Sequence, residues 1–533
     1  MSGLIHPDSH FSGVKEGHLR KAAYKHLRMH AHVSNRLQIF EDVGPTRKFS
    51  INIYGCSKAP KFTHVSWLYS PETLRSSITH DGQGPLPGIK HNGKWDSRPH
   101  SDRLVQVDSA RLTEWNRLSG ENTIPDTEAP LLYPVTVREQ GAISALSLFT
   151  TRLADYNVHL TQGYNETNAK KDGFIRWSTG DVDNINEVVL QGPHFLAGTP
   201  FAQNPKIPCK SPRDWRETPA HTLEIDYIPR TNYVRSCDLN RYQVTQDVWD
   251  DKCYTEHFRL AWRRMIDFDG NRSLFAALIP PGPSHVDAVN SMILADNRRT
   301  SLTAGFWAAL PLDYLLRITD RSDLRVAEAQ KMPAVDPAHP LASALLLRAL
   351  RLNVLTSHYS ALWEELYDPR WAGYEDWANP AWSCLNPLAA GLTATWEYNT
   401  PFRTEYERRA ALVELDALVS VWLGITADQL VAIYKSRYPV LSDYESAMYF
   451  DANGRKIAGN HNTYGHDQTK QDYLDLVTHL ESPTTTSPPT GYTAPFHKAD
   501  REAEMRAAHA HFQARLDKEI AVGRWTPPER RQA

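Results

Sequence analysis

The stretch from residue 56 to residue 245 constrains the fold of this 533-residue chain most, because it holds few long periodic runs. Pro, Gly, Asn and Trp are frequent in it, and residues 80–85 (HDGQGP) and 191–195 (QGPHF) are of the types that set tight turns. This composition predicts short strands on extended loops, interrupted by one helix around residues 139–156. Such a loop-rich lobe often presents polar side chains to a ligand, but it is also common in irregular domains.

The preceding segment, residues 16–40, shows the period of a helix. Its apolar residues recur at three- and four-residue steps, with lysine and arginine between them: Leu19, Ala22, Ala23 and Leu27. Residues 48–55 then alternate apolar and polar side chains and stop at Gly55, which predicts a strand followed by a turn. We therefore expect a basic amphipathic helix, a boundary near residue 47, and a strand.

The chain becomes more regular after residue 255. Residues 258–265 and 273–279, followed by a Pro-Pro-Gly turn, predict a pair of strands. Three helices are expected after them, over residues 302–316, 341–355 and 405–424. In the last of these, Leu412, Leu415, Val419 and Trp422 form one apolar stripe, and Arg408, Arg409, Glu414 and Asp416 mostly lie elsewhere. Gly424 ends that helix, and Thr426 with Gln429 forms a capping box for the next one.

The C-terminal part contains a low-complexity segment, residues 482–491 (SPTTTSPPTG). Such a composition is typical of a linker that does not pack. A charged helix is predicted over residues 498–522, and the linker indicates that this helix is a separate appendage.

The charges are distributed unevenly along the chain. The whole sequence has a net charge of −3, which excludes a polycation that coats nucleic acid without discrimination. Residues 1–100 nevertheless hold 14 Lys/Arg against 7 Asp/Glu, a net +7 with ten histidines besides, so the remaining residues carry −10. If the protein binds a polyanion, we expect the first hundred residues to do so.

The sequence also predicts a cellular location. No apolar stretch approaches the roughly 20 residues of a membrane span, so we expect no membrane partner. The start, residues 1–7 (MSGLIHP), lacks the features of a secretory signal. The five cysteines lie far apart without a C-x-x-C pair, which argues against a disulfide framework and a thiolate zinc site. A cytoplasmic protein with reduced thiols is expected.

Several reaction centres are missing from the sequence. An adenine methyltransferase needs a glycine-rich turn for S-adenosylmethionine and an (N/D)-P-P-(Y/F/W) loop for the flipped adenine. The nearest strings, residues 279–282 (IPPG) and 379–382 (NPAW), lack the paired elements. There is no Walker loop, G-x-S-x-G elbow or H-E-x-x-H helix. Acidic pairs such as residues 224–226 (EID) and 267–269 (DFD) lack the lysine that a magnesium-dependent nuclease would place after them.

Two weaker patterns could hold a metal ion. His26, His30 and His32 would place two imidazoles on one face of a helix at a spacing that zinc uses. No third ligand is evident, and histidines that contact phosphate or pack against a neighbour explain the pattern better. Residues 451–454 (DANG) hint at a calcium loop, but the remaining oxygen ligands are absent, so we expect a turn.

A succession of strings resembles the large adenine-specific methyltransferases of single-chain type IIG restriction-modification enzymes and related phage-defence systems. Residues 4–11 (LIHPDSHF) with 19–28 (LRKAAYKHLR) resemble the tail of their catalytic domain, and residues 49–55 (FSINIYG), 88–90 (GIK) and 95–100 (WDSRPH) resemble the segment that follows. The strings that resemble their recognition region come later, in family order: residues 188–195 (VVLQGPHF), 226–233 (DYIPRTNY), 262–264 (WRR), 271–274 (NRSL), 278–282 (LIPPG) and 312–317 (LDYLLR).

This resemblance begins where the methyltransferase fold is already ending. It implies a mixed α+β, multi-lobed chain with a loop-rich recognition lobe, a more helical C-terminal lobe and no complete Rossmann-like methyltransferase domain. It also implies that a separate methyltransferase catalytic subunit holds S-adenosylmethionine, since this chain has no cofactor or catalytic residues of its own, or that the chain is a truncated or split gene product. The expected divisions are 1–47 (tail of the methyltransferase-like domain), 48–245 (recognition lobe), 246–480 (target-recognition and C-terminal lobe), 481–497 (linker) and 498–533 (charged helix).

The resulting hypothesis is that the protein reads a site on double-stranded DNA and positions it for that partner. The basic first hundred residues would contact phosphates, and polar side chains of the central lobe would contact base edges. The residues predicted to bind DNA are Lys90, Lys94, Arg98, Arg230, Arg263, Arg264 and Arg272. Each of them is also explained by an ordinary structural or solvated charge. The alternative is an orphaned or structural fragment that bridges the subunits of a defence complex, and an independent nuclease would need a metal site that the sequence lacks.

Overall fold

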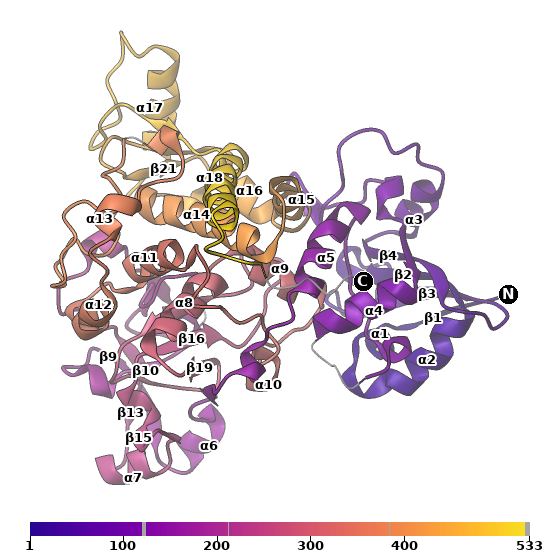
Figure 1. Cartoon of the computed structure of the whole chain (residues 1–533), viewed down its shortest axis with the longest axis horizontal. Helices are drawn as coiled ribbons and strands as arrows, with labels where there is room; N and C mark the ends of the chain where they lie inside the picture. Colours follow the sequence, from indigo (N-terminus) through magenta and orange to yellow (C-terminus); the bar gives the residue numbers. More distant parts are fainter. Residues whose placement is uncertain (120–123, 212, 383, 528–533) are drawn as a thin grey trace.

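The structure, a computed structural model, describes residues 1–119, 124–211, 213–382 and 384–527. It confirms the predicted mixed α+β class, with several small sheets and a more helical C-terminal part. Figure 1 shows the N-terminal lobe, residues 1–119, beside a larger body that holds the central strands and the C-terminal helices. No helix in the described part of the chain has the length and apolar character needed to span a bilayer.

The N-terminal lobe is built on a five-stranded sheet. In the order of hydrogen-bonded neighbours, its strands are β1 (Ser2–Pro7), β3 (Lys48–Tyr54), β2 (Leu27–Ser34), β4 (Lys61–Leu68) and β7 (Val105–Asp108). β2 and β4 run parallel, and the other neighbouring pairs are antiparallel. β3 confirms the strand predicted over residues 48–55. β1 is an edge strand on which Leu4 and Ile5, on opposite faces, are 54% and 59% exposed.

The helix predicted over residues 16–40 is wrong in its second half. Helix α2 (Gly17–His26) ends at His26, and β2 follows directly. Residues 27–34 alternate apolar and polar side chains, a strand pattern that overlaps the helical one. Because β2 lies between β3 and β4, its polar residues are buried as well as its apolar ones. The boundary that was predicted near residue 47 lies in the connection between β2 and β3, which pair with each other in one sheet.

The predicted short strands on long loops are present in the first part of the body. They are β8 (His159–Thr161), β9 (Ile175–Gly180), β10 (Val189–Leu190), β11 (Gln203–Pro205), β12 (Trp215–Glu217), β13 (Thr231–Arg235), β14 (Val248–Trp249) and β15 (Lys252–Cys253). The predicted helix around residues 139–156 is the shorter α5 (Gln140–Leu148). The prediction that only one helix interrupts residues 56–245 is wrong, because the stretch also holds α3 (Pro71–Ile78), α4 (Ser109–Ser119), α6 (Glu166–Lys171) and α7 (Leu239–Val244). β16 (Arg259–Arg263) and β17 (Ala276–Ile279) confirm the predicted strand pair, and with β19 (Val289–Ile293) and β8 they form a four-stranded antiparallel sheet.

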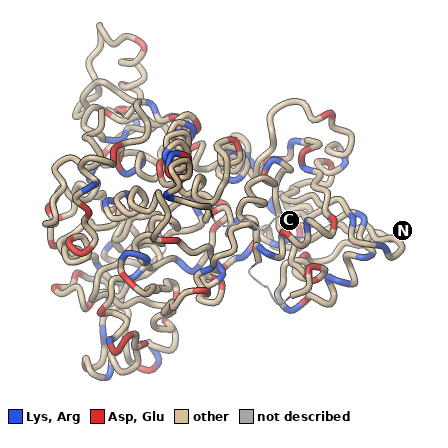
Figure 2. Tube along the Cα trace, viewed as in Figure 1, with Lys and Arg blue, Asp and Glu red and all other residues tan. Residues whose placement is uncertain are grey.

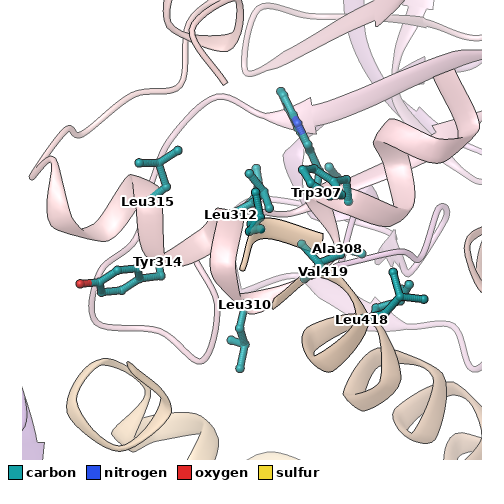
Figure 3. Packing of buried hydrophobic residues seen from close by; sticks show 14 of the residues in the cluster. Trp307, Ala308, Leu310, Leu312, Tyr314, Leu315, Leu418 and Val419 are labelled. Carbon is teal, nitrogen blue, oxygen red and sulfur yellow. The ribbon is translucent and has the colours of Figure 1, made fainter. Parts of the chain in front are cut away.

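The helices of the body pack around one core (Figure 3). α11 (Ala342–Asn353), α14 (Glu405–Leu423) and α15 (Ala427–Arg437) confirm the predictions, including the left-handed Gly424 (φ 74°) and the Thr426–Gln429 capping box. The single helix expected over residues 302–316 is instead two, α8 (Asn297–Trp307) and α9 (Leu310–Ile318). Ala309 is extended between them, and Pro311 lies in the first turn of α9, where a proline is tolerated.

The charged C-terminal helix is α18 (Arg501–Ala521). The prediction that this helix is a separate appendage is wrong. It packs along α14, as the yellow helix in Figure 1 shows, and buries Met505, Ala508, Phe512 and Leu516 at helical spacing. Its first turn also enters an ion network: Asp416 of α14 accepts hydrogen bonds from Arg501 at 2.5 Å and from Arg272 at 3.2 Å. The carboxylate of Asp416 therefore faces packed neighbours and not water.

Candidate nucleic-acid interface

A group of basic side chains with no carboxylate partner in the described structure lies on the N-terminal lobe, where the end of α2 meets the turn between β3 and β4. Lys58 N donates to Lys25 O at 2.9 Å, and Gly55 N donates to His26 O at 2.7 Å, so the helix end and the turn are fixed together. Arg28 donates from the same end to the carbonyl oxygens of Leu27 and Cys56. We call Lys25, His26, Arg28 and Lys58 the α2 patch.

Helix geometry favours positive charge in the α2 patch. Lys25 and His26 occupy the last turn of α2, where the partial negative charge of the helix end stabilises cations. Lys25, His26 and Lys58 are exposed, and Arg28 is half-buried. Figure 2 shows lysine and arginine along this side of the lobe. The basic composition of the first hundred residues is thus partly concentrated on one surface.

A short hairpin carries two of the predicted DNA-binding residues. β5 (Lys90–His91) and β6 (Lys94–Trp95) pair through Asn92 (φ 50°) and Gly93 (φ 72°), the left-handed pair of a tight hairpin turn. Lys94 is exposed, and the ammonium of Lys90 lies 4.6 Å from the centroid of the Trp95 ring. The guanidinium of Arg36, in the segment after β2, lies 5.1 Å from the same centroid. Two cations, Lys90 and Arg36, therefore lie against one half-buried indole, and Lys94 is exposed at the neighbouring position of the hairpin.

Arg98, the third predicted residue of this region, holds the loop below the hairpin. Its guanidinium donates to both carboxylate oxygens of Asp96, at 3.0 and 2.6 Å, and to Leu86 O at 3.1 Å. Burial raises the pKa of Asp96, but the hydrogen bonds from Arg98 and from the Gly88 backbone outweigh it and lower that pKa below its usual range. The contacts of Arg98 are those of a structural charge that shapes the hairpin.

The four predicted arginines of the body all have contacts with other residues of the protein. Arg230 donates to Asp181 at 2.9 Å, and Arg264 lies near Asp287 and Asp323. The guanidinium carbon of Arg263 lies 4.3 Å from the centroid of the Phe275 ring. Burial lowers the pKa of Arg263 to about 10. Arg272 is 4% exposed and paired with Asp416 in the core, so its predicted contact with base edges is corrected to a structural role. The structure does not bring these four arginines together into one basic surface.

Two of the three histidines singled out in the sequence, His30 and His32, belong to a buried polar cluster, whereas His26 is exposed at the end of α2. His30 and His32 are on β2, so the helical spacing that suggested a zinc site is wrong. The ring of His30 bonds Asp8 at 2.8 Å on one side and His64 at 2.9 Å on the other, and Tyr133 donates to Asp8 at 2.6 Å. Burial raises the pKa of Asp8, but His30 outweighs it and holds that pKa below its usual range.

The other histidines of this cluster are held uncharged. Burial lowers the pKa of His32 to about 4 and that of His64 well below its usual value. The described residues hold no group of three or more His, Cys, Asp or Glu side chains placed to bind a metal ion. The cluster therefore supports the sheet from within, and alternation along β2 was the pattern that could have placed these side chains. Residues 451–454, the other candidate, form the turn between β20 (Met448–Phe450) and β21 (Lys456–Ala458).

A large cleft, about 610 Å³, lies between the loop-rich segment and the C-terminal helices. Much of its charged wall is neutralised internally. Arg409 pairs with Glu445 at 2.8 Å and Glu504 at 2.6 Å, and Lys456 pairs with Glu405 at 3.1 Å. These pairs neutralise part of the wall, and Arg216 and Arg408, which also line the cleft, have no ion pair in the described structure.

Comparisons with known proteins give a distant resemblance only. No family model and no curated protein matches the chain. Among solved structures, the type IIG restriction endonuclease BpuSI is similar over 83% of this chain (TM-score 0.25, 11% identity), and the type IIL restriction-modification enzyme MmeI, solved in complex with DNA, is similar over 83% (TM-score 0.33, 10% identity). The chain spans about half the length of these structures, 48% and 50%. Scores this low establish neither fold nor function.

Proposed function

We propose that this chain is the DNA-recognition part of a bacterial adenine-specific methyltransferase of restriction-modification or phage-defence type. It would act with a separate catalytic subunit that binds S-adenosylmethionine. The observation that carries the DNA-binding part of the proposal is the pair of basic features on the N-terminal lobe, the α2 patch and the β5–β6 hairpin. The methyltransferase assignment rests on the sequence strings that resemble that family.

The two features have the chemistry of different contacts. Lys25 and Lys58 are exposed side chains without a carboxylate partner in the described structure, so their ammonium groups are available for phosphate contacts. The hairpin is a two-stranded ribbon, an element that the major groove of DNA admits. Its tip exposes His91 and Asn92 between Lys90 and Lys94, and an asparagine amide can pair with the edge of an adenine.

A mobility-shift titration of duplex DNA at several salt concentrations tests this proposal. The variant Lys25→Gln/Lys58→Gln removes two cations without touching the core. If each lysine neutralises one phosphate, the slope of log affinity against log salt falls by about 0.9 per contact, or about 2 in total. Binding should weaken on every duplex to a similar extent, because phosphate contacts carry no sequence information.

The matched control is Lys171→Gln/Lys470→Gln. Both lysines are exposed at helix ends in the body, on α6 (Glu166–Lys171) and α17 (Lys470–Glu481). This control should leave the slope unchanged. Equal effects of the two double variants, or no binding by the wild-type chain at low salt, would contradict the proposal.

A second function, bridging the subunits of a defence complex, is favoured by the open edge of β1. Leu4 and Ile5 are exposed on both faces of this strand, which is the edge where another strand can add. Leu4→Lys/Ile5→Lys should then abolish the co-purification of this chain with the other subunits of its system while DNA binding persists. Unchanged co-purification would exclude β1 as the bridging edge.

A further inference from the structure

The cleft between the loop-rich segment and the C-terminal helices has the size of a site for a small molecule. Its volume of about 610 Å³ lies within the range of roughly 300 to 1,000 Å³ that is usual for such sites. Most of its lining comes from residues 196–220, from α14 and from residues 441–467. The contacts proposed above for DNA leave this cleft unused.

Arg408 of α14 brings a positive charge to the wall of the cleft, without a carboxylate partner in the described structure. Its Nη2 donates to Thr199 Oγ1 at 2.7 Å, to Leu352 O at 3.0 Å and to Gly198 O at 3.4 Å, and its Nη1 donates to Phe402 O at 3.1 Å. These bonds fix the guanidinium in place. Of its five N–H groups, the one on Nε and the second one on Nη1 find no acceptor among the described residues. The side chain is half-buried and Nε is not fully enclosed, so a ligand in the cleft can reach it.

The charge of Arg408 is costly where it lies. Burial, and to a smaller extent Arg403, lowers the pKa of Arg408 to about 10, and Glu407 offsets part of this effect. The guanidinium is therefore charged at neutral pH although its surroundings disfavour the charge. Charged groups that are taken out of water are normally paired with an opposite charge. A bound anion would supply the charge that the described protein groups do not.

Arg216, on β12, adds a second cation to the lining. Its side chain is exposed and has neither a hydrogen bond nor an ion pair in the described structure. Two acidic residues, Glu217 and Asp467, also line the cleft outside the buried ion pairs, but both are exposed, and water and salt screen their charge. The half-buried charge of Arg408 is screened less, so the cleft favours an anionic ligand.

The C-terminal part of the lining offers groups that suit a planar ring. Tyr444 and Tyr464 are half-buried, and neither a cation nor another aromatic ring lies against them in the described structure. Asn462, two residues before Tyr464, is exposed, and its side-chain amide has no partner among the described residues. Aromatic side chains stack on nucleobases, and an asparagine amide can pair with the edge of a base. The cleft thus combines groups for an anion with groups for a base.

We propose that this cleft binds a free nucleoside monophosphate. Arg408 would bind the phosphate through Nε and Nη1, and Arg216 would add a second positive charge. Two cations match the charge of a phosphate monoester, which is close to −2 at neutral pH. The ring of Tyr444 or Tyr464 would stack on the base, and the amide of Asn462 would bond to its edge. This site goes beyond the proposed DNA-binding function and lies in the body, whereas the α2 patch and the hairpin lie on the N-terminal lobe.

The test titrates the full chain by calorimetry with the monophosphates of adenosine, guanosine, cytidine and uridine. Inorganic phosphate and adenosine, each of which lacks one half of the ligand, are the reference probes. Arg216→Gln removes an exposed side chain without bonds in the described structure, so it should fold as well as the wild type. Arg176→Gln is the matched control, because Arg176 is exposed on another short strand of the body, β9, and is likewise unbonded there. Arg408→Lys keeps the charge but loses the planar guanidinium.

We expect at least one nucleotide to bind, and phosphate or adenosine alone to bind at least about tenfold more weakly, since each makes only part of the contacts. Arg216→Gln should weaken nucleotide binding by roughly three- to tenfold and Arg408→Lys by roughly tenfold or more, while Arg176→Gln should change nothing. Failure of all four nucleotides to bind would overturn the inference. Equal effects of Arg216→Gln and Arg176→Gln would overturn it too, as would inorganic phosphate binding as tightly as a nucleotide. Displacement of the nucleotide by duplex DNA would assign the cleft to the DNA strand and contradict a free nucleotide.

Discussion

Replacing Asp416 by alanine should destabilise the body of the protein strongly. The carboxylate is fully buried on α14 and accepts hydrogen bonds from Arg501 at 2.5 Å, from Arg272 at 3.2 and 3.3 Å, and from Leu310 N at 2.7 Å. Removing it leaves two buried guanidinium groups short of a partner.

Arg501 and Arg272 keep different numbers of hydrogen-bond acceptors in the Asp416→Ala variant. Arg501 keeps Glu445, to which it donates twice at 2.9 Å, but Arg272 keeps only the carbonyl oxygen of Ala308 at 3.1 Å. One buried charge is therefore left uncompensated, which costs about 3 to 5 kcal/mol. The Leu310 N–H, left unpaired as well, places the expected loss of unfolding free energy at the upper end of that range.

Urea unfolding followed by tryptophan fluorescence measures this loss. The control is Asp428→Ala, because Asp428 pairs with Arg506 at the surface and its side chain is 87% exposed. Such a pair contributes at most about 1 kcal/mol. Asp416→Asn should recover little, since the amide keeps an acceptor for Leu310 but not the charge. If Asp416→Ala and Asp428→Ala shifted the unfolding midpoint equally, the buried network would not hold the helices together as argued.

Three further predictions concern other parts of the chain. Burial raises the pKa of Glu445, but Arg409 and Arg501 outweigh it and lower that pKa from 4.5 to about 2, so roughly 3 kcal/mol of stability should be present above pH 5 and lost as the pH falls towards 2. Glu445→Gln should flatten this dependence in urea titrations at different pH. Gly424→Ala should lower the melting temperature through a cost of roughly 1 kcal/mol, because φ is 74° there, whereas Gly373→Ala should have less effect, since a Cβ there meets open space. The purified chain, given radiolabelled S-adenosylmethionine and duplex DNA, should transfer no methyl group, and labelled adenine would refute the division of labour proposed above.

Local patterns predicted elements well where one signal acted alone. The strand pair β16–β17, the cap at Gly424 and the capping box at Thr426 were all readable because turn and cap residues act through their nearest neighbours. β2 was misjudged because a helical step and a two-residue alternation coincide in the same segment, and sheet pairing decides between them. Pro311 was the available sign that one expected helix would be two.

The sites were harder to predict because they depend on contacts between distant residues. Lysine and arginine counts pointed to the first hundred residues, and the hairpin residues Lys90 and Lys94 are at a surface there. The composition could not show that Arg272 pairs with Asp416, which is 144 residues away in the sequence. Residues 67–69 and 266–269, which line one small cavity together, are likewise far apart in the sequence, and no local pattern in either segment predicts that they meet.

The position of α18 has a consequence for how the chain is made. Asp416 is synthesised 85 residues before Arg501. Until Arg501 is made, the buried carboxylate on α14 therefore lacks one of its ion-pair partners. During that interval the face that later receives Phe512 and Leu516 is open to water and to chaperones or proteases. Translation that stops before residue 501 should thus yield a chain that a cell clears quickly.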